Sequence, residues 1–195
     1  MDNIKNNKPD YTDRKYEVVA YDPEWPKTFE SEAIRLKEVF LDDALDIEHI
    51  GSTSVPGLNS KPTIDILIIV NDVSVVDPHI SEMESLGYKY LGEYVKPGSR
   101  LFIKERPGNA DRLFNVHFFP NNHPHIRDMI RLRDYFRTHP EEAKKYANLK
   151  RELSEKHPDN YAQYRKLKDE YMEDLKKRVL NSDRDPSTNS GQAGQ

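Results

Sequence analysis

The chain contains no cysteine and no long apolar run, and these two absences exclude several classes of protein. Without cysteine there is neither a disulfide framework nor a thiolate metal site. No window of the sequence reaches the apolar length that a membrane span requires. Residues 1–15 are polar and charged and lack the apolar core of a secretion signal. The sequence therefore predicts a cytoplasmic protein with no membrane partner.

An excess of positive charge is also missing. The formal net charge is -4, with 33% charged and 35% hydrophobic residues among the 195. A dedicated nucleic-acid binder of the basic-stripe kind is therefore not expected, and no strong nucleic-acid signal remains. A site for a nucleotide or a phosphorylated small molecule needs only a few local cations and stays open. The sequence does not indicate an oligomeric state.

Glycine is absent from residues 123–181, which also hold only three prolines, each near an expected helix end. This composition predicts a helical extension of one domain over 16–181. We expect the polar segments 1–15 and 182–195 to be disordered. The three helices of the extension are expected over 124–138, 140–156 and 159–180.

The part before the extension alternates between strand and helix patterns. Apolar residues at spacings of four, three and four predict a helix after the turn at Asp22-Pro23. The run 63–70 is apolar on both faces, so we expect it to be a central strand. The fold class is therefore α+β, a mixed sheet with flanking helices. Further strands are expected over 16–21, 46–50, 87–95, 100–106 and 113–119, and a further helix over 73–86.

The most specific segment joins the expected strands 46–50 and 63–70. It reads Glu-His-Ile-Gly-Ser-Thr-Ser-Val-Pro-Gly-Leu from Glu48 onward, and one carboxylate, Asp65, interrupts the following apolar run. A turn at Gly51-Ser52 offers backbone N–H groups and a hydroxyl to an anion such as phosphate. A charge inside an apolar strand needs a partner or a cation. Together the two features predict a phosphate-and-metal site.

Each of these residues also has an ordinary structural interpretation. Ser52 could simply cap the segment that follows the turn. Asp65 could form a buried ion pair with Lys61 or Arg100. His117, which shares a strand face with Asn115, is as compatible with a hydrogen-bonded core histidine as with a ligand.

Two further pairs carry the same ambiguity. Glu48 and His49 point to opposite faces of their strand, so only one of them can lie beside Asp65. Arg133 and Arg137 are one helical turn apart, a spacing that suits bidentate phosphate recognition and ordinary salt bridges equally.

The sequence resembles the GrpB family (UPF0157), which is placed in the nucleotidyltransferase superfamily of DNA polymerase beta-like proteins. The blocks that carry the resemblance extend from about residue 16 to 180. They are Tyr21-Asp22-Pro23-Glu24-Trp25, the segments 47–58 and 61–66, Asn115-Val116-His117, the segment 133–140, Tyr146 and Leu149-Lys150.

The resemblance implies a nucleotidyltransferase-like fold in which the Gly-Ser turn holds phosphates. In that superfamily two acids, one residue apart on the next strand, and a third on a later strand bind magnesium. Here only Asp65 is kept, because Leu67 occupies the second position and Asn115 and His117 stand on the later strand. One aspartate and one histidine make a poor magnesium site and suit manganese or zinc better.

We therefore expect a protein that binds a nucleotide or another phosphorylated ligand, with metal-dependent nucleotidyl transfer as the reaction implied by the resemblance. The alternative is a catalytically degenerate fold that serves as a ligand-binding or protein-interaction module. Three carboxylates within reach of a metal would favour the enzyme, and one would favour the module. The expected catalytic residues are Asp65 and Ser52. The expected ligand-binding residues are Gly51, Ser52, Thr53, Lys61, Arg133 and Arg137. The expected ligands of a divalent metal (Mg or Mn) are Asp65, His117 and Glu48.

Overall fold

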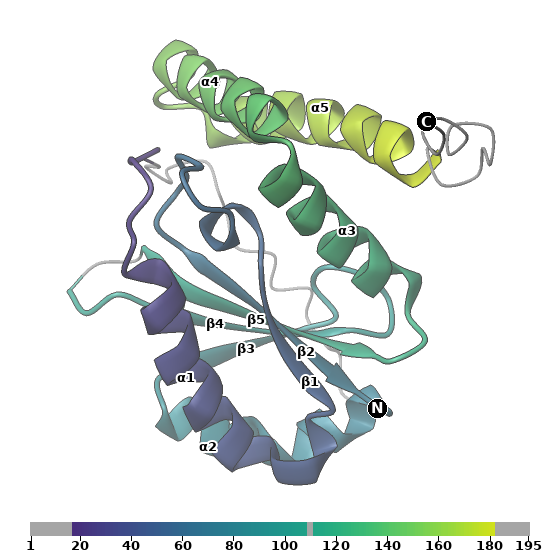
Figure 1. Cartoon of the computed structure of the whole chain (residues 1–195). Coiled ribbons are helices and arrows are strands. Elements are labelled where there is room, and N and C mark those ends of the chain that lie inside the picture. Colours follow the sequence, from purple (N-terminus) through teal and green to yellow (C-terminus); the bar gives the residue numbers. More distant parts are fainter. Residues whose placement is uncertain (1–16, 109–110, 182–195) are drawn as a thin grey trace, which may run out of the picture.

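The computed structural model describes residues 17–108 and 111–181, which form a layered α+β structure (Figure 1). The expected disorder of 1–15 and 182–195 lies outside the described residues. Val19 forms an isolated antiparallel bridge with Ser60, and the described residues of the segment 16–21 make no further strand pairing. The segment therefore runs beside the loop before the central strand and does not extend the sheet.

Five strands form one mixed sheet in the order β1-β2-β5-β4-β3. β2 is central, as its two apolar faces predict, and pairs antiparallel with β1 and parallel with β5. The remaining pairs are antiparallel. The strands are β1 (Asp46–Ile50), β2 (Ile64–Val70), β3 (Tyr88–Gly92), β4 (Arg100–Glu105) and β5 (Arg112–Pro120).

One face of the sheet is covered by α1 (Trp25–Phe40), a 3₁₀ helix (Val73–His79) and α2 (Ile80–Ser85). Leu36 and Phe40 of α1 are fully buried there against alternate residues of β2. The prediction of a single helix over 73–86 is wrong in detail. Its first half is 3₁₀ and contains Pro78, which has no N–H for an α-helical hydrogen bond.

The other face carries the helical extension, as expected. It consists of α3 (Pro124–Thr138), α4 (Pro140–Lys156) and α5 (Tyr161–Asn181), with Pro at the start of the first two. α3 packs on the sheet through Ile126, which contacts Leu67 and Phe119. α4 and α5 lie beyond it and enclose a second core with the loop after β1. The extension therefore places helical side chains above the carboxyl end of β1.

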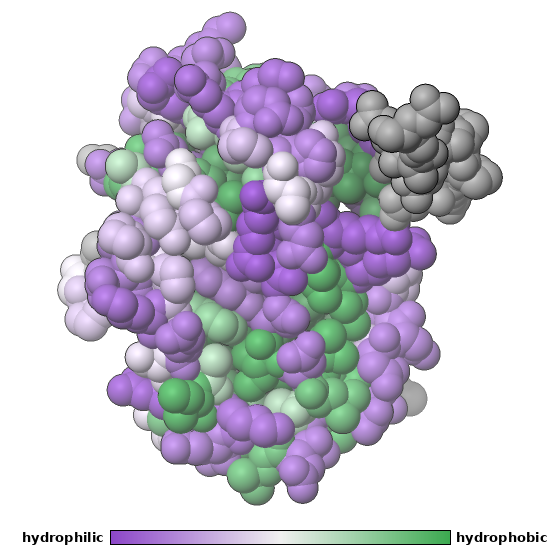
Figure 2. Space-filling view, in the orientation of Figure 1, coloured by the Kyte–Doolittle hydropathy of each residue, from purple (hydrophilic) through white to green (hydrophobic). Residues whose placement is uncertain are grey.

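Hydrophobic surface in Figure 2 gathers in the lower half of this view, over the sheet, whereas hydrophilic residues cover most of the helices above it. Within residues 17–108 and 111–181, no helix has the length and apolar character needed to cross a membrane.

Candidate functional site

Gly51 and Asp65 are in direct contact, and this contact explains why glycine follows β1. Ile50 is paired with Asp65 across the β1–β2 ladder, so the chain turns directly above the carboxylate. Gly51 has a φ of 73°, and a Cβ atom at this position would lie 2.5 Å from Asp65 Oδ2. Only glycine meets both conditions. The expected adjacency of the Gly-Ser turn and Asp65 is confirmed.

The Asp65 carboxylate is held by two side chains of β5. Asn115 Nδ2 donates to Asp65 Oδ1 at 2.7 Å, and His117 Nε2 lies 3.5 Å from the same oxygen. Burial favours a raised pKa for Asp65, but the His117 and Asn115 interactions outweigh it and hold the pKa below its ordinary value. The carboxylate is therefore ionised at neutral pH.

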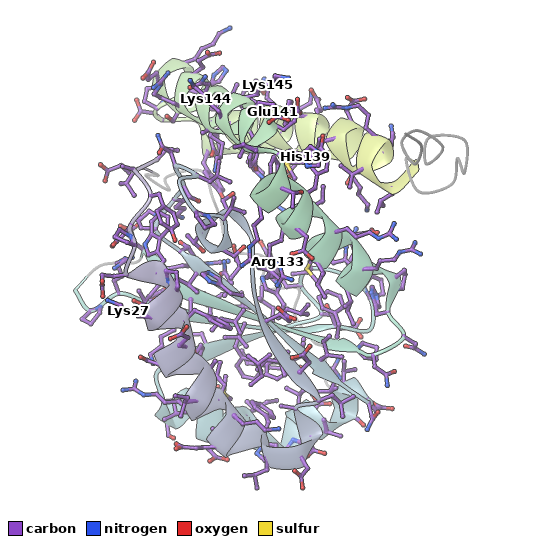
Figure 3. All side chains as sticks on the ribbon, in the orientation of Figure 1. Lys27, Arg133, His139, Glu141, Lys144 and Lys145 are labelled. Atoms are coloured by element: carbon purple, nitrogen blue, oxygen red, sulfur yellow. The ribbon has the colours of Figure 1, made fainter. Side chains whose placement is uncertain are left out.

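His117 and Glu48 lie on the same sheet face as Asp65, but they differ in their partners. Arg133 donates to Glu48 and also to Asp134 and the His49 carbonyl (Figure 3). Among the described residues, no three His, Asp or Glu side chains gather closely enough to hold a metal ion. The expected ligand set of Asp65, His117 and Glu48 is therefore not assembled, because Glu48 is committed to Arg133.

The donor set consequently fits a two-cation centre poorly. Only Asp65 and His117 are adjacent, and His117 Nδ1 is buried without a hydrogen-bond partner among the described residues. A single Mg²⁺ or Mn²⁺ held here needs further oxygen ligands from a bound phosphate or from water.

Thr53 and Arg137, two expected ligand-binding residues, contact the turn and the residues around it. Thr53 is buried, and its hydroxyl lies 3.0 Å from His49 Nε2 and 3.4 Å from the Thr63 carbonyl oxygen. Arg137 donates to the Ser54 carbonyl through Nε at 3.0 Å and a terminal nitrogen at 2.9 Å. Neither side chain lines the two cavities described below.

A cavity of about 190 Å³, here called the cationic cavity, opens beside Ser52 and Asp65. Lys61 lines it, as expected for a ligand-binding residue, and so do Lys150 of α4 and Lys168 of α5. Lys168 pairs with Asp169 at 2.6 Å. Three lysines and Ser52 therefore line one small space. The other lining residues are Ser60, Thr63, Arg112, Asn115, Tyr146, Tyr161 and Tyr164.

Lys150 is the unusual member of this group. Its side chain is 3% exposed, and Nζ has no hydrogen-bond partner within the described part of the chain. Nζ lies 4.6 Å from the centre of the Tyr146 ring, a cation–π contact. Burial, and secondarily Lys168, lowers the pKa of Lys150 to about 7. The charged form of Lys150 is costly at this depth, and an anion in the cavity would stabilise it.

A second cavity of about 400 Å³, here called the apolar cavity, adjoins the first. Its walls include Ile50 of β1, Met129, Leu132 and Phe136 of α3, and Met172 of α5. Gly51, Arg133, His125, His117 and Asp169 also line it. Four residues border both cavities, and Asp65 is therefore at their junction: Ser52, Asp65, Tyr146 and Lys168.

Lys150 and Lys168 are not among the site residues expected from the sequence. Both break an apolar helix face, Lys150 beside Tyr146 and Leu153 of α4, and Lys168 between Tyr164 and Leu175 of α5. A charge on a buried stripe is a usable signal, but only packing shows that the two stripes meet at Ser52. His125 of α3 is half-buried, and burial lowers its pKa to about 4.

Comparison with known proteins agrees with this architecture. Over residues 15–178 the chain matches the family model described as "GrpB protein". The UPF0157 protein YqkA of Bacillus subtilis is 40% identical over 83% of this chain, although the match spans only 46% of YqkA.

Solved structures give the same result. The conserved protein GrpB of Enterococcus faecalis is 37% identical and superposes with a TM-score of 0.80 over 87% of this chain and all of that one. A cytoplasmic RNA terminal U-transferase gives a TM-score of 0.49 at 15% identity over 71% of this chain and 42% of its own, a likeness that says nothing about activity. From the family match and the Enterococcus structure, this chain belongs to the GrpB family.

Proposed function

We propose that this protein binds a phosphorylated small molecule, with the phosphate in the cationic cavity. The observation that carries the proposal is the buried Lys150 ammonium, which lines the cavity without a hydrogen-bond partner among the described residues. A phosphate would supply the missing acceptor, and charge-assisted hydrogen bonds to a phosphate oxygen are among the strong ones. Lys168, Lys61 and the Ser52 hydroxyl border the same space and would share the negative charge.

Binding is favoured over nucleotidyl transfer by the number of available carboxylates. The two carboxylates that line the cavities are Asp65 and Asp169, and Asp169 is paired with Lys168. One available acid corresponds to the ligand-binding module, by the criterion stated above. Metal-dependent transfer remains the second candidate. In that case Asp65 and His117 would hold one Mg²⁺ or Mn²⁺, which would neutralise phosphate charge, while Asp65 Oδ2 faces the junction beside Gly51.

The test compares pyrophosphate binding to wild type, Lys150→Met and Lys144→Met. Lys144 is an exposed lysine of the same helix, at the end of the molecule away from the sheet, and serves as the matched control (Figure 3). At a hundred times its dissociation constant, pyrophosphate should stabilise wild type by about 2.7 kcal/mol. This corresponds to a rise in Tm of roughly 5–10 °C.

Lys150→Met should lose at least about tenfold in affinity, the effect of losing about 1.4 kcal/mol. Lys144→Met should bind as wild type does. Equal affinity in wild type and Lys150→Met would contradict the proposal. Transfer is tested by incubation with nucleoside triphosphates and Mg²⁺ or Mn²⁺. Pyrophosphate release that disappears in Asp65→Asn would identify the enzyme, and binding without release would identify the module.

A further inference from the structure

The apolar cavity differs from its neighbour in the kind of group it can accept. Ile50, Met129, Leu132, Phe136 and Met172 present hydrocarbon and thioether surface to it. Met129, Leu132 and Met172 are only partly buried, so part of that surface is still available to a ligand. Methionine side chains are flexible and adapt to apolar groups of different shape.

Several of the polar groups that border this cavity are already engaged or uncharged, although His117 Nδ1 has no hydrogen-bond partner among the described residues. Arg133 donates to Glu48 and Asp134, and Asp169 pairs with Lys168. The pKa of His125, lowered to about 4 by burial, keeps its ring neutral at pH 7. A ligand group with several hydrogen-bonding atoms, such as a nucleobase, would leave many of them without partners here. Burying such atoms unpaired is unfavourable.

The two cavities are neighbours that share part of their lining. Ser52, Asp65, Tyr146 and Lys168 border both, so a molecule whose phosphate lies near Lys150 can extend past Asp65 toward Met129 and Met172. From this shared lining and the contrast between the walls, we infer that the ligand is a phosphate ester of an apolar aliphatic or aromatic alcohol. The inference rests on the proposed phosphate site and names the class of its ligand.

The experiment measures calorimetric dissociation constants for four probes: inorganic phosphate, hexyl phosphate, phenyl phosphate and AMP. Each buried methylene contributes about 0.8 kcal/mol, which is about fourfold in affinity. Hexyl and phenyl phosphate should therefore bind at least about tenfold more tightly than inorganic phosphate. AMP should bind less tightly than either of these two esters.

The matched variant is Met129→Gln/Met172→Gln, which makes the cavity polar with little change in side-chain size. In this variant, the hexyl and phenyl esters should lose most of their advantage in affinity over inorganic phosphate. The affinity for inorganic phosphate itself should not change. Ile34→Gln is the control, because Ile34 is 63% exposed on α1, on the opposite face of the sheet.

Three outcomes would overturn the inference while leaving the phosphate site intact. They are esters that bind no better than inorganic phosphate, an undiminished gain in the double variant, and AMP as the tightest probe. Failure of all four probes to bind would instead refute the phosphate site itself, and the inference with it.

Discussion

Gly51, Asp65 and Lys150 are the residues whose surroundings are hardest to explain by folding alone. Gly51 leaves room for Asp65 Oδ2, and Asp65 is held ionised by His117 and Asn115. Lys150 is a buried cation without a hydrogen-bond partner among the described residues. Strained or unsatisfied groups of this kind persist in proteins mainly at functional sites. All three meet around the two cavities.

Gly51→Ala should destabilise the protein by about 2–4 kcal/mol, because alanine adds a clash with Asp65 to the strain of a positive φ. Gly57→Ala is the matched control. Gly57 has a φ of 76° but nothing within 4 Å of an added Cβ, so only about 1–2 kcal/mol is expected. Urea unfolding of both variants measures the difference. Equal losses would mean that the Asp65 contact is easily relieved.

Lys150→Met should stabilise the unliganded protein in a pH-dependent way. The pKa of Lys150 falls from 10.5 to about 7 on folding, so the unfolded chain binds more protons between these values. The cost of the buried charge is therefore full below pH 7 and disappears as pH rises toward 10.5. The variant should gain roughly 2–4 kcal/mol at pH 6 and little at pH 10. Chemical unfolding at both pH values measures the free energy of unfolding of wild type and variant. A stabilisation of the variant that does not change with pH would contradict the lowered pKa of Lys150.

At the scale of secondary-structure elements, two arginines hold α3 against the sheet and the turn. Arg133 pairs with Glu48 of β1, and Arg137 donates to the Ser54 carbonyl. Arg137, expected to bind a ligand, uses part of its guanidinium to hold the turn, and its role toward a ligand stays a prediction. Arg133 does line the apolar cavity, but its guanidinium is already paired with Glu48. Four-residue spacing aligns two side chains without fixing what each one meets.

A double-mutant cycle on Glu48→Gln and Arg133→Gln should show a coupling of about 1–2 kcal/mol. The Arg133 side chain is only 9% exposed and that of Glu48 31%, so each single variant leaves a partly buried charge unpaired. The control cycle is Glu24 and Lys27, whose side chains are 62% and 71% exposed, so water screens the pair and a clearly smaller coupling is expected. Thermal or urea unfolding supplies both values. Similar coupling energies in the two cycles would show that the Glu48–Arg133 ion pair does not hold α3 against the sheet.

At the scale of the whole molecule, helices cover both faces of a single sheet. The C-terminal helices on one face complete the walls of both cavities. Val55 and Leu58 of the loop after β1 are buried with Leu175 and Val179 of α5. Because this second core joins the loop to the helical extension, we expect the extension and the sheet to unfold together.

The single tryptophan makes cooperative unfolding measurable. Trp25 is buried in the core between α1 and the sheet, whereas far-ultraviolet circular dichroism also reports α3, α4 and α5. The two signals should follow one transition with the same Tm. Two separated transitions would show that the extension is an independent unit and that the site can open without loss of the sheet.

The sequence by itself determined the α+β class, the family, the central position of β2, the three helices from Pro124 onward and the closeness of the Gly51-Ser52 turn to Asp65. These follow from local periodicity, helix-end signals and a short segment between paired strands, all of which act over a few residues. Only the tertiary structure decided that Arg133 engages Glu48, that Thr53 and Arg137 support the turn, and that Lys150 and Lys168 meet beside Ser52. Arg133 and Arg137 bond to residues 85 and 83 positions away in the chain, and Lys150 and Lys168 are likewise far from Ser52, so these contacts depend on how helices pack across the sheet. Thr53 bonds within its own loop, to His49 and Thr63, which the sequence spacing alone does not reveal.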